Sequence, residues 1–170
     1  MHPLVGDRFQ GLLYRALNPV YARDPLSGRG AALFGGRFNR KGREALYTAL
    51  RPETALREAN QVGTLQPTTL VAYRADLQPI FDGRDGAALD PYGLDVAALA
   101  AADWRNRMLR GAPVPTQDFA EQLVADGFVG LAVPSYAKGA VERDLNLVLW
   151  CWNTGANDGV EVVDDEGRLL

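Results

Sequence analysis

Gly35-Gly36-Arg37-Phe38-Asn39 is the stretch from which the fold and the site of this chain can be worked out. It lies late in the segment 19–43, which holds five glycines and which we expect to be a long loop. Adjacent glycines let a backbone adopt conformations closed to other residues and approach a ligand closely. The arginine that follows them is a planar cation suited to phosphate. Because long loops inside compact domains are usually functional, we predict an anion-binding site around Arg37.

On both sides of this stretch, strand-like runs dominate the chain and helices interrupt them singly. The runs expected as strands are 12–17, 45–50, 68–75, 80–82, 128–133, 145–152 and 159–163. The runs expected as helices are 52–61, 97–102 with an extension toward Trp104, and 117–126. This order is not a regular βαβ series. It predicts an α+β fold with a compact core made of a mixed or antiparallel β-sheet.

Particular residues mark the expected helix ends. Asp95 and Thr116 are the candidate N-caps of the second and third helices, since their side chains can accept hydrogen bonds from the first turn. Pro52 fits the first position of the first helix. Gly63 and Gly127 are the expected stops of the first and third helices, because glycine readily leaves the helical conformation.

Length and composition bound the class of protein. With 170 residues, of which 47% are hydrophobic and 23% charged, we expect residues 1–170 to form a single globular domain. The formal net charge of −3 argues against direct binding of nucleic acid, which needs a basic face to displace counterions. The N-terminus lacks a basic-then-apolar leader, and no apolar run reaches about 18 residues. We therefore expect a cytoplasmic protein that does not enter a membrane.

Metal and cysteine chemistry lack their usual residues in this sequence. Cys151 is the only cysteine, so no disulfide can form within the chain, and its apolar surroundings predict a buried thiol. His2 is the only histidine, so zinc catalysis and a histidine-based triad are disfavoured. We expect no metal, although a site made only of carboxylates stays an unsupported alternative.

Two residues on expected strands are candidates for a binding site. Arg15 lies in the middle of an apolar strand, where a charge either faces water or points into a cleft, and the sequence leaves both open. Tyr47 shares a strand face with Ala45 and Ala49. It is either a half-buried core residue or an aromatic plate for a flat ring.

Glu58 lies on the helix that follows, where a solvated glutamate is the common alternative to a functional one. Leu56, Ala59 and Val62 are the expected buried stripe of this helix. The loop, the strand and the helix could together bring the carboxylate of Glu58 near Arg37.

Two polar residues on later strands complete the candidate set. Ser135 follows Pro134 at the end of an apolar strand, and no histidine can activate it, so a serine hydrolase is disfavoured. Asn146 enters another apolar strand, where a buried amide needs hydrogen-bond partners. It either orients the serine or caps the edge of the sheet.

Together these residues resemble the RES domain family, the toxins of bacterial toxin–antitoxin pairs whose partner is an Xre-type DNA-binding protein. The family is named for an arginine, a glutamate and a serine. The matching stretches, which span most of the chain, are 13–15, 27–31, 35–39, 46–49, 54–58, 133–135 and 146–149. Two features depart from the family pattern: Phe38 stands where tryptophan is more usual, and the role of 76–126, which carries no matching motif, stays open.

The resemblance implies a fold like that of ADP-ribosyltransferases and a cleft that takes NAD as its substrate without a metal. The implied catalytic residues are Glu58, Arg37 and Ser135. The implied NAD-binding residues are Arg15, Arg37, Tyr47 and Asn146. Which of the two arginines contacts which phosphate stays open.

Members of this family consume NAD, some by degrading it with water or phosphate and some by attaching ADP-ribose to a protein. The resemblance therefore implies a type II toxin that cleaves the nicotinamide–ribose bond of NAD and arrests growth. Water, phosphate and protein all stay open as the acceptor of ADP-ribose. The implied partner is an Xre-type antitoxin. The alternative is a non-catalytic module of the same fold that binds NAD or a protein.

Overall fold

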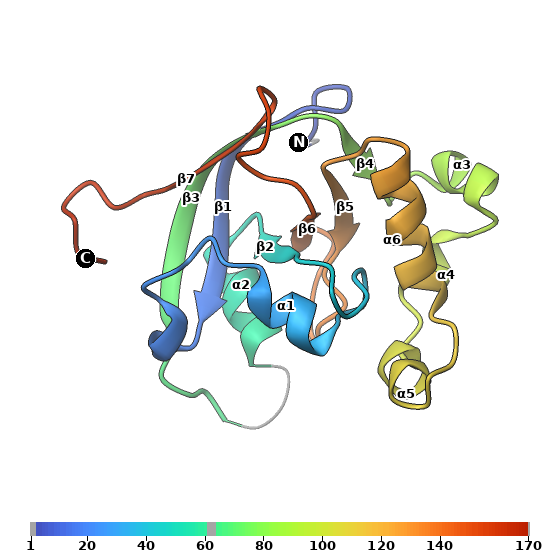
Figure 1. Cartoon of the computed structure of the whole chain (residues 1–170), viewed down its shortest axis with the longest axis horizontal. Helices are drawn as coiled ribbons and strands as arrows, with labels where there is room; N and C mark the ends of the chain where they lie inside the picture. The colour runs from blue at the N-terminus through green and yellow to red at the C-terminus, as the bar shows by residue number, and fades with distance from the viewer. Residues whose placement is uncertain (1–2, 61–63, 170) are drawn as a thin grey trace.

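Seven strands form one curled sheet in the computed structural model, which describes residues 3–60 and 64–169 (Figure 1). The strands are β1 (Phe9–Leu17), β2 (Leu46–Ala49), β3 (Thr69–Leu77), β4 (Ile80–Asp82), β5 (Gly130–Pro134), β6 (Leu145–Leu149) and β7 (Asp158–Val162). Their order across the sheet is β4-β5-β6-β2-β1-β3-β7. Only β4 and β5 pair in parallel, and the other neighbours are antiparallel. The predicted α+β fold with a mixed sheet is confirmed.

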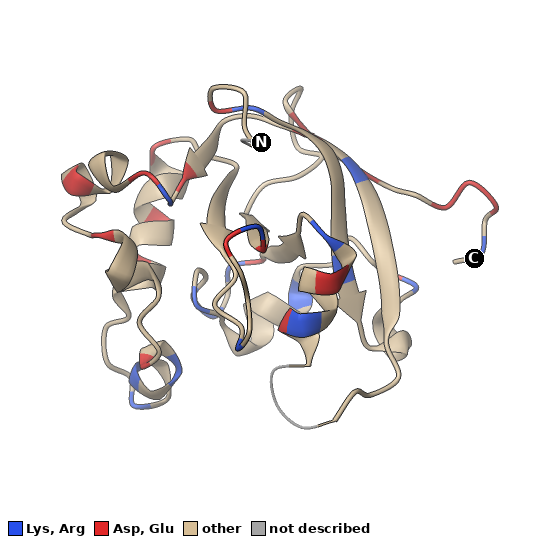
Figure 2. Ribbon diagram, turned by 180° about the vertical axis from the view of Figure 1, so that it is seen from behind, with Lys and Arg blue, Asp and Glu red and all other residues tan. Residues whose placement is uncertain are grey.

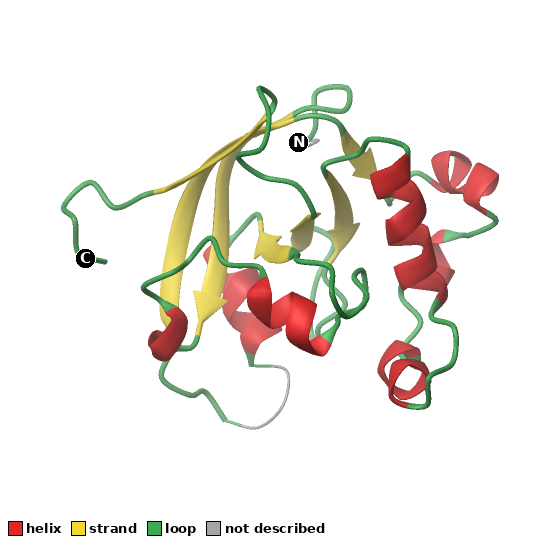
Figure 3. Ribbon diagram, in the orientation of Figure 1, coloured by secondary structure: helices red, strands yellow, loops and turns green. Residues whose placement is uncertain are grey.

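Short helices surround this sheet, and most of them lie to one side of it (Figure 3). The helices are α1 (Arg29–Phe34), α2 (Pro52–Ala59), α3 (Gly86–Leu89), α4 (Val96–Leu99), α5 (Trp104–Leu109) and α6 (Pro115–Ala125), with 3-10 turns η1 (Pro19–Tyr21) and η2 (Asp90–Tyr92). Among the described residues, no helix combines the length and the apolar character needed to cross a membrane.

The core has two parts because β6 is buried on both faces. Leu147 and Leu149 point into the cluster enclosed by the curl of the sheet. Val148 points to the other face, where it joins the cluster that includes Phe119 and Leu123 of α6. Successive residues of a strand face opposite sides, so both faces of β6 need apolar residues. Asn146 is the one residue of β6 with a polar side chain, and it is an exception to this apolar pattern because it belongs to the site described below.

The prediction that the segment 19–43 is a loop throughout is wrong. It contains η1 and the helix α1, bounded by Gly28 and Gly35. The φ of Gly35 is 71°, a left-handed conformation that ends the helix readily only because the residue is glycine. A helix of six residues is too short to show a clear apolar period, which is why the pattern did not reveal it.

The helices of the second half begin and end differently from the prediction. Asp95 is the N-cap of α4, as expected, and accepts a hydrogen bond from the amide of Ala98 at 2.7 Å. The helix ends at Leu99, however, and α5 begins anew at Trp104. Thr116 is not the N-cap of α6.

The N-cap of α6 is Val114, because Pro115 takes the first helical position and the threonine hydroxyl is used elsewhere. Gly127, with φ of 92°, follows this helix as predicted. Helix α2 ends at Ala59, with Asn60 as its C-cap, before the predicted end at Gln61. Gln61, the expected stop Gly63 and His2 lie outside the described residues. Cys151 is half-buried rather than buried, because β6 ends at Leu149, before it.

Candidate functional site

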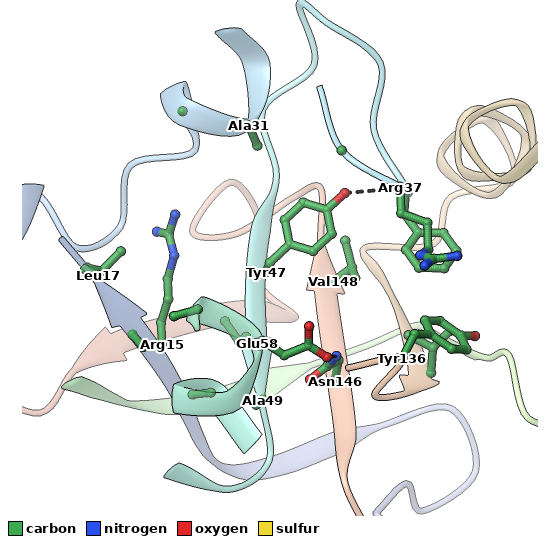
Figure 4. Close-up of a pocket in the computed structure, with 18 of the residues that line it drawn as sticks. Arg15, Leu17, Ala31, Arg37, Tyr47, Ala49, Glu58, Tyr136, Asn146 and Val148 are labelled. Carbon is green, nitrogen blue, oxygen red and sulfur yellow. Dashed lines mark hydrogen bonds between the residues drawn. The ribbon is translucent and has the colours of Figure 1, made fainter. Parts of the chain in front are cut away.

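A cleft of about 470 Å³ opens where β1, β2 and β6 meet α2 and the loop after α1 (Figure 4). Among the residues that line it are five of the six candidates from the sequence: Arg15, Arg37, Tyr47, Glu58 and Asn146. The sixth, Ser135, is not among the lining residues and contacts Glu58 instead. The fold thus brings together side chains from both halves of the chain.

The sheet register places Tyr47 and Asn146 on the same face as the cluster packed against α6. Tyr47 lies opposite Val148, and Ala49 lies opposite Asn146. The small side chain of Ala49 leaves room above the amide, and Val133 flanks the amide from the other neighbouring strand. The cleft is therefore a continuation of this packed face, left open where small and polar residues replace large apolar ones.

The carboxylate of Glu58 is held by two side chains. Its Oε1 accepts a hydrogen bond from Oγ of Ser135 at 2.5 Å and another from Nδ2 of Asn146 at 2.6 Å. Ser135 is only 8% exposed, so it supports the carboxylate from behind. The Oδ1 atom of Asn146 is buried and has no hydrogen-bond partner among the residues that the structure describes. Such an atom in a cleft wall is an acceptor for a donor group of a ligand.

Helix α2 presents Glu58 to the cleft because its buried face differs from the prediction. Thr54 and Ala55 are the buried residues of this helix. Glu58 follows them at spacings of four and three, so it shares their face. Of the predicted stripe, Leu56 is half-buried, Ala59 is exposed and Val62 lies outside the described residues. The apolar pattern misled because the small Ala55 and the polar Thr54, not the larger Leu56, are buried on this helix, and Thr54 makes a polar contact.

That contact is the buried carboxylate of Asp144. It accepts hydrogen bonds from Oγ1 of Thr54 at 2.7 Å, Nη1 of Arg57 at 2.6 Å and the amide of Val141 at 2.9 Å. The Val141 amide and then the Thr54 hydroxyl hold the pKa of Asp144 below its usual value. Its backbone oxygen also accepts from the amide of Ser135 at 2.7 Å. One residue therefore fixes both the helix of Glu58 and the serine that supports it.

Arg37 enters the cleft from the opposite side. Its Nη1 donates to the backbone oxygens of Leu99 at 3.1 Å and Ala101 at 2.6 Å. Its guanidinium carbon lies 4.7 Å from the ring centroid of Tyr136 and 5.8 Å from that of Trp104. Burial lowers the pKa of Arg37, but an arginine still keeps its charge. Within the described part of the chain, backbone oxygens and aromatic rings thus hold the cation, and it forms no salt bridge.

The loop that carries Arg37 is held to the rest of the protein by its backbone. Oγ1 of Thr116 donates to the oxygen of Arg37 at 2.6 Å, and Nε2 of Gln117 donates to the oxygen of Gly36 at 2.8 Å. Nε1 of Trp150 donates to the oxygen of Phe38 at 2.8 Å. The loop is therefore a rigid mount for the guanidinium, as precise binding requires.

Tyr47 completes this mount. Its hydroxyl accepts from the amide of Phe38 at 3.0 Å and donates to Oδ1 of Asn39 at 2.8 Å. Burial raises the pKa of the Tyr47 phenol, which therefore stays protonated. A Cβ at Gly36 would lie 2.4 Å from that hydroxyl, so only glycine fits there. The hydroxyl of Tyr47 therefore hydrogen-bonds to the loop, and its ring is the part that can contact a ligand in the cleft.

Arg15 points into the cleft, which decides between the two alternatives that the sequence left open (Figure 4). Its Nη1 donates to the backbone oxygens of Pro25 at 3.2 Å and Ser27 at 3.1 Å. Among the described residues, neither Arg15 nor Arg37 forms a salt bridge. Glu58 is the only acidic residue among those that line the cleft. An otherwise acidic protein therefore has a cationic cleft.

The sequence missed the wall made by Trp104, Arg105 and Tyr136, which also line the cleft. The first two come from the segment 76–126, whose role was open, and Leu99 and Ala101 of that segment anchor Arg37. No local pattern marks these residues, because backbone oxygens carry the contact. Within the described part of the chain, no three His, Cys, Asp or Glu side chains gather to hold a metal ion.

The fold is similar to that of a chain in a solved structure, the crystal structure of the M. tuberculosis MbcT-MbcA toxin–antitoxin complex. The TM-score is 0.64 at 20% identity, and the match covers 92% of this chain and 83% of that chain. The family model for the RES domain matches residues 12–170. The chain therefore belongs to the RES domain family, as the motifs indicated. No curated protein matches the sequence.

Proposed function

We propose that this chain is the toxin of a toxin–antitoxin pair, and that it binds NAD and cleaves its nicotinamide–ribose bond. One observation carries the proposal: a fixed carboxylate, Glu58, lies in the same cleft as two arginines that form no salt bridge with the described residues. Membership of the RES domain family and the fold shared with a chain of a toxin–antitoxin complex support it.

The residue types suit the reaction. Breaking the bond between ribose C1′ and the pyridinium nitrogen leaves an oxocarbenium-like ribose, as glycoside cleavage does. The carboxylate of Glu58 stabilises this cation, and the guanidinium groups of Arg15 and Arg37 bind the diphosphate. The ring of Tyr47 supports the nicotinamide. The bonding electrons neutralise the pyridinium nitrogen, so nicotinamide leaves without a general acid or a metal.

The acceptor takes the place of nicotinamide at C1′ and loses its proton to solvent. Water, phosphate and a protein side chain are all compatible with the cleft. In this proposal residues 1–170 act as one NAD-binding domain in the cytoplasm, and the loss of NAD or the modification of a protein arrests growth. An Xre-type antitoxin holds the toxin inactive in its host.

The direct test is nicotinamide release from NAD by the purified chain, measured in buffer, with phosphate added and with cell lysate added. We expect release in at least one of these, and a labelled protein band with lysate if the acceptor is a protein. Glu58→Gln is the matched control, because glutamine keeps an oxygen for Ser135 and Asn146 but removes the charge. It should reduce release on the order of 100-fold.

Absence of release in all three conditions would overturn the proposal. NAD binding without release would identify a binding module instead of an enzyme. The two results are distinguished by measuring NAD affinity on the same preparation.

A further inference from the structure

Four side chains form a stack along one wall of the cleft: Arg105, Trp104, Arg37 and Tyr136. The guanidinium carbon of Arg105 lies 5.0 Å from the ring centroid of Trp104, and that of Arg37 lies 5.8 Å from the same ring. Tyr136 lies beyond Arg37, at 4.7 Å. Cation–π contacts of this kind fix the direction of a guanidinium group that would otherwise sample many rotamers.

Among the described residues, neither guanidinium group of this stack, Arg37 or Arg105, forms a salt bridge. The charge of Glu58 acts on Arg37 without such a contact. Asp103, two residues before Arg105 in the chain, pairs with Arg107 at 2.6 Å instead. Helix α5 therefore carries one arginine that is paired, Arg107, and one that lines the cleft, Arg105. The ribbon of this helix is largely blue in Figure 2, beside a short acidic stretch.

The two cations also affect each other. Burial is the main cause that lowers the pKa of Arg37. The acidic groups of Tyr136, Glu58 and Tyr47 raise it, and the positive charge of Arg105 lowers it by a smaller effect. An anion bound between the two cations would offset their repulsion. Within the described part of the chain, only Nη1 of Arg37 donates hydrogen bonds to the protein. The other nitrogens of that fork are donors for a ligand.

We propose that Arg105 binds the diphosphate of the dinucleotide together with Arg37, with Trp104 as the platform that orients both. This inference rests on the proposed function, because it takes NAD as the ligand of the cleft. A diphosphate carries two negative charges and several acceptor oxygens, and paired guanidinium forks match them bidentately. The segment 76–126, in which we recognise no family motif, thereby supplies a binding residue.

Calorimetric titration of the full chain with ADP-ribose and with adenosine tests this directly. ADP-ribose carries the diphosphate, whereas adenosine is an uncharged nucleoside. Arg105→Gln should weaken ADP-ribose binding about tenfold, the effect of one charge-assisted hydrogen bond, and leave adenosine binding unchanged. Arg107→Gln is the matched control, since it removes the same charge from the same helix away from the cleft, and it should change neither.

Equal affinity of Arg105→Gln and the wild type for ADP-ribose would overturn the inference, and so would an equal loss for both ligands. A wild type that does not bind ADP-ribose would overturn it too. The test does not depend on turnover. If Arg105→Gln releases nicotinamide with an unaltered KM, Arg105 does not bind the diphosphate, and the proposed function stands. If the affinity for ADP-ribose depends on Arg105 but no nicotinamide is released, Arg105 binds the diphosphate, and the proposed reaction is wrong.

Discussion

Oγ of Ser135 lies 2.5 Å from Oε1 of Glu58, although 77 positions separate the two residues in the chain. The serine is buried behind the carboxylate and is not among the residues that line the cleft. Its geometry is that of a residue that orients another one. Ser135 therefore does not have the geometry of a nucleophile. In addition, none of the candidate site residues is a histidine that could activate it.

Ser135→Ala should therefore lower the turnover number more than it raises KM. Without the hydroxyl, the carboxylate of Glu58 loses one of its fixed donors and its position beside the ribose, which should reduce kcat on the order of 10- to 100-fold. Steady-state nicotinamide release measures both constants. A rise in KM with unchanged kcat would show that Ser135 acts in binding NAD and not through Glu58.

Gly36→Ala should destabilise the protein and weaken NAD binding together. The added methyl group would lie 2.4 Å from the Tyr47 hydroxyl and 2.6 Å from Oδ1 of Asn39, so the loop or the tyrosine must move. Overpacking of this kind costs about 1–3 kcal/mol of unfolding free energy. Gly86→Ala is the control, because nothing lies near its Cβ position. Urea denaturation compares the two variants, and equal stability would contradict the close packing of Gly36.

Asp144→Asn should destabilise the protein in a manner that depends on pH. The pKa of Asp144 is lower in the folded state than its ordinary value of 3.8. The unfolded chain therefore binds the proton more readily, so the ionised carboxylate stabilises the fold fully above that ordinary value and less as the pH falls below it. The difference in unfolding free energy between the wild type and the variant should be constant from pH 7 to about 5 and shrink below about 4. A difference that does not change with pH would show that the charge of Asp144 is not what holds α2.

Thr54→Val should lower both stability and turnover, whereas Thr54→Ser should keep turnover close to that of the wild type. Valine matches the shape of threonine but leaves the Asp144 carboxylate without one donor, at a cost of about 1–2 kcal/mol. Serine keeps the hydroxyl that bonds Asp144 at 2.7 Å. Thermal unfolding and nicotinamide release give the two readouts. Similar turnover in both variants would show that the hydroxyl does not position Glu58.

Arg37→Gln should abolish growth arrest when the chain is expressed in bacteria and leave the fold intact. Among the described residues, the side chain donates hydrogen bonds only to two backbone oxygens and otherwise contacts aromatic rings, so its loss removes a binding cation without unpairing a buried carboxylate. Growth curves after induction, together with the melting temperature of the purified variant, provide the measurement. Full toxicity of a folded Arg37→Gln protein would contradict an anion-binding role.

The fold class, the positions of most strands and the identity of the candidate site residues could all be predicted from the residue pattern alone. Local patterns were enough for this, because alternating apolar residues define strands and glycines mark the special loop. The order of the RES motifs was equally visible in one dimension. The predictions from sequence were wrong for α1, for the N-cap of α6 and for the buried face of α2. In these places a short helix or a polar contact hides the apolar period.

Which of these residues contact one another, and which of them face the cleft, could be seen in the three-dimensional structure alone. The pairing of Ser135 with Glu58, the polar anchor at Asp144 and the wall of Trp104 and Arg105 all join segments distant in sequence. Hydrogen bonds to backbone oxygens, such as those from Arg37, leave no signature in the residue types that provide them. Spatial convergence of this kind depends on how the whole sheet curls, and no local pattern encodes it.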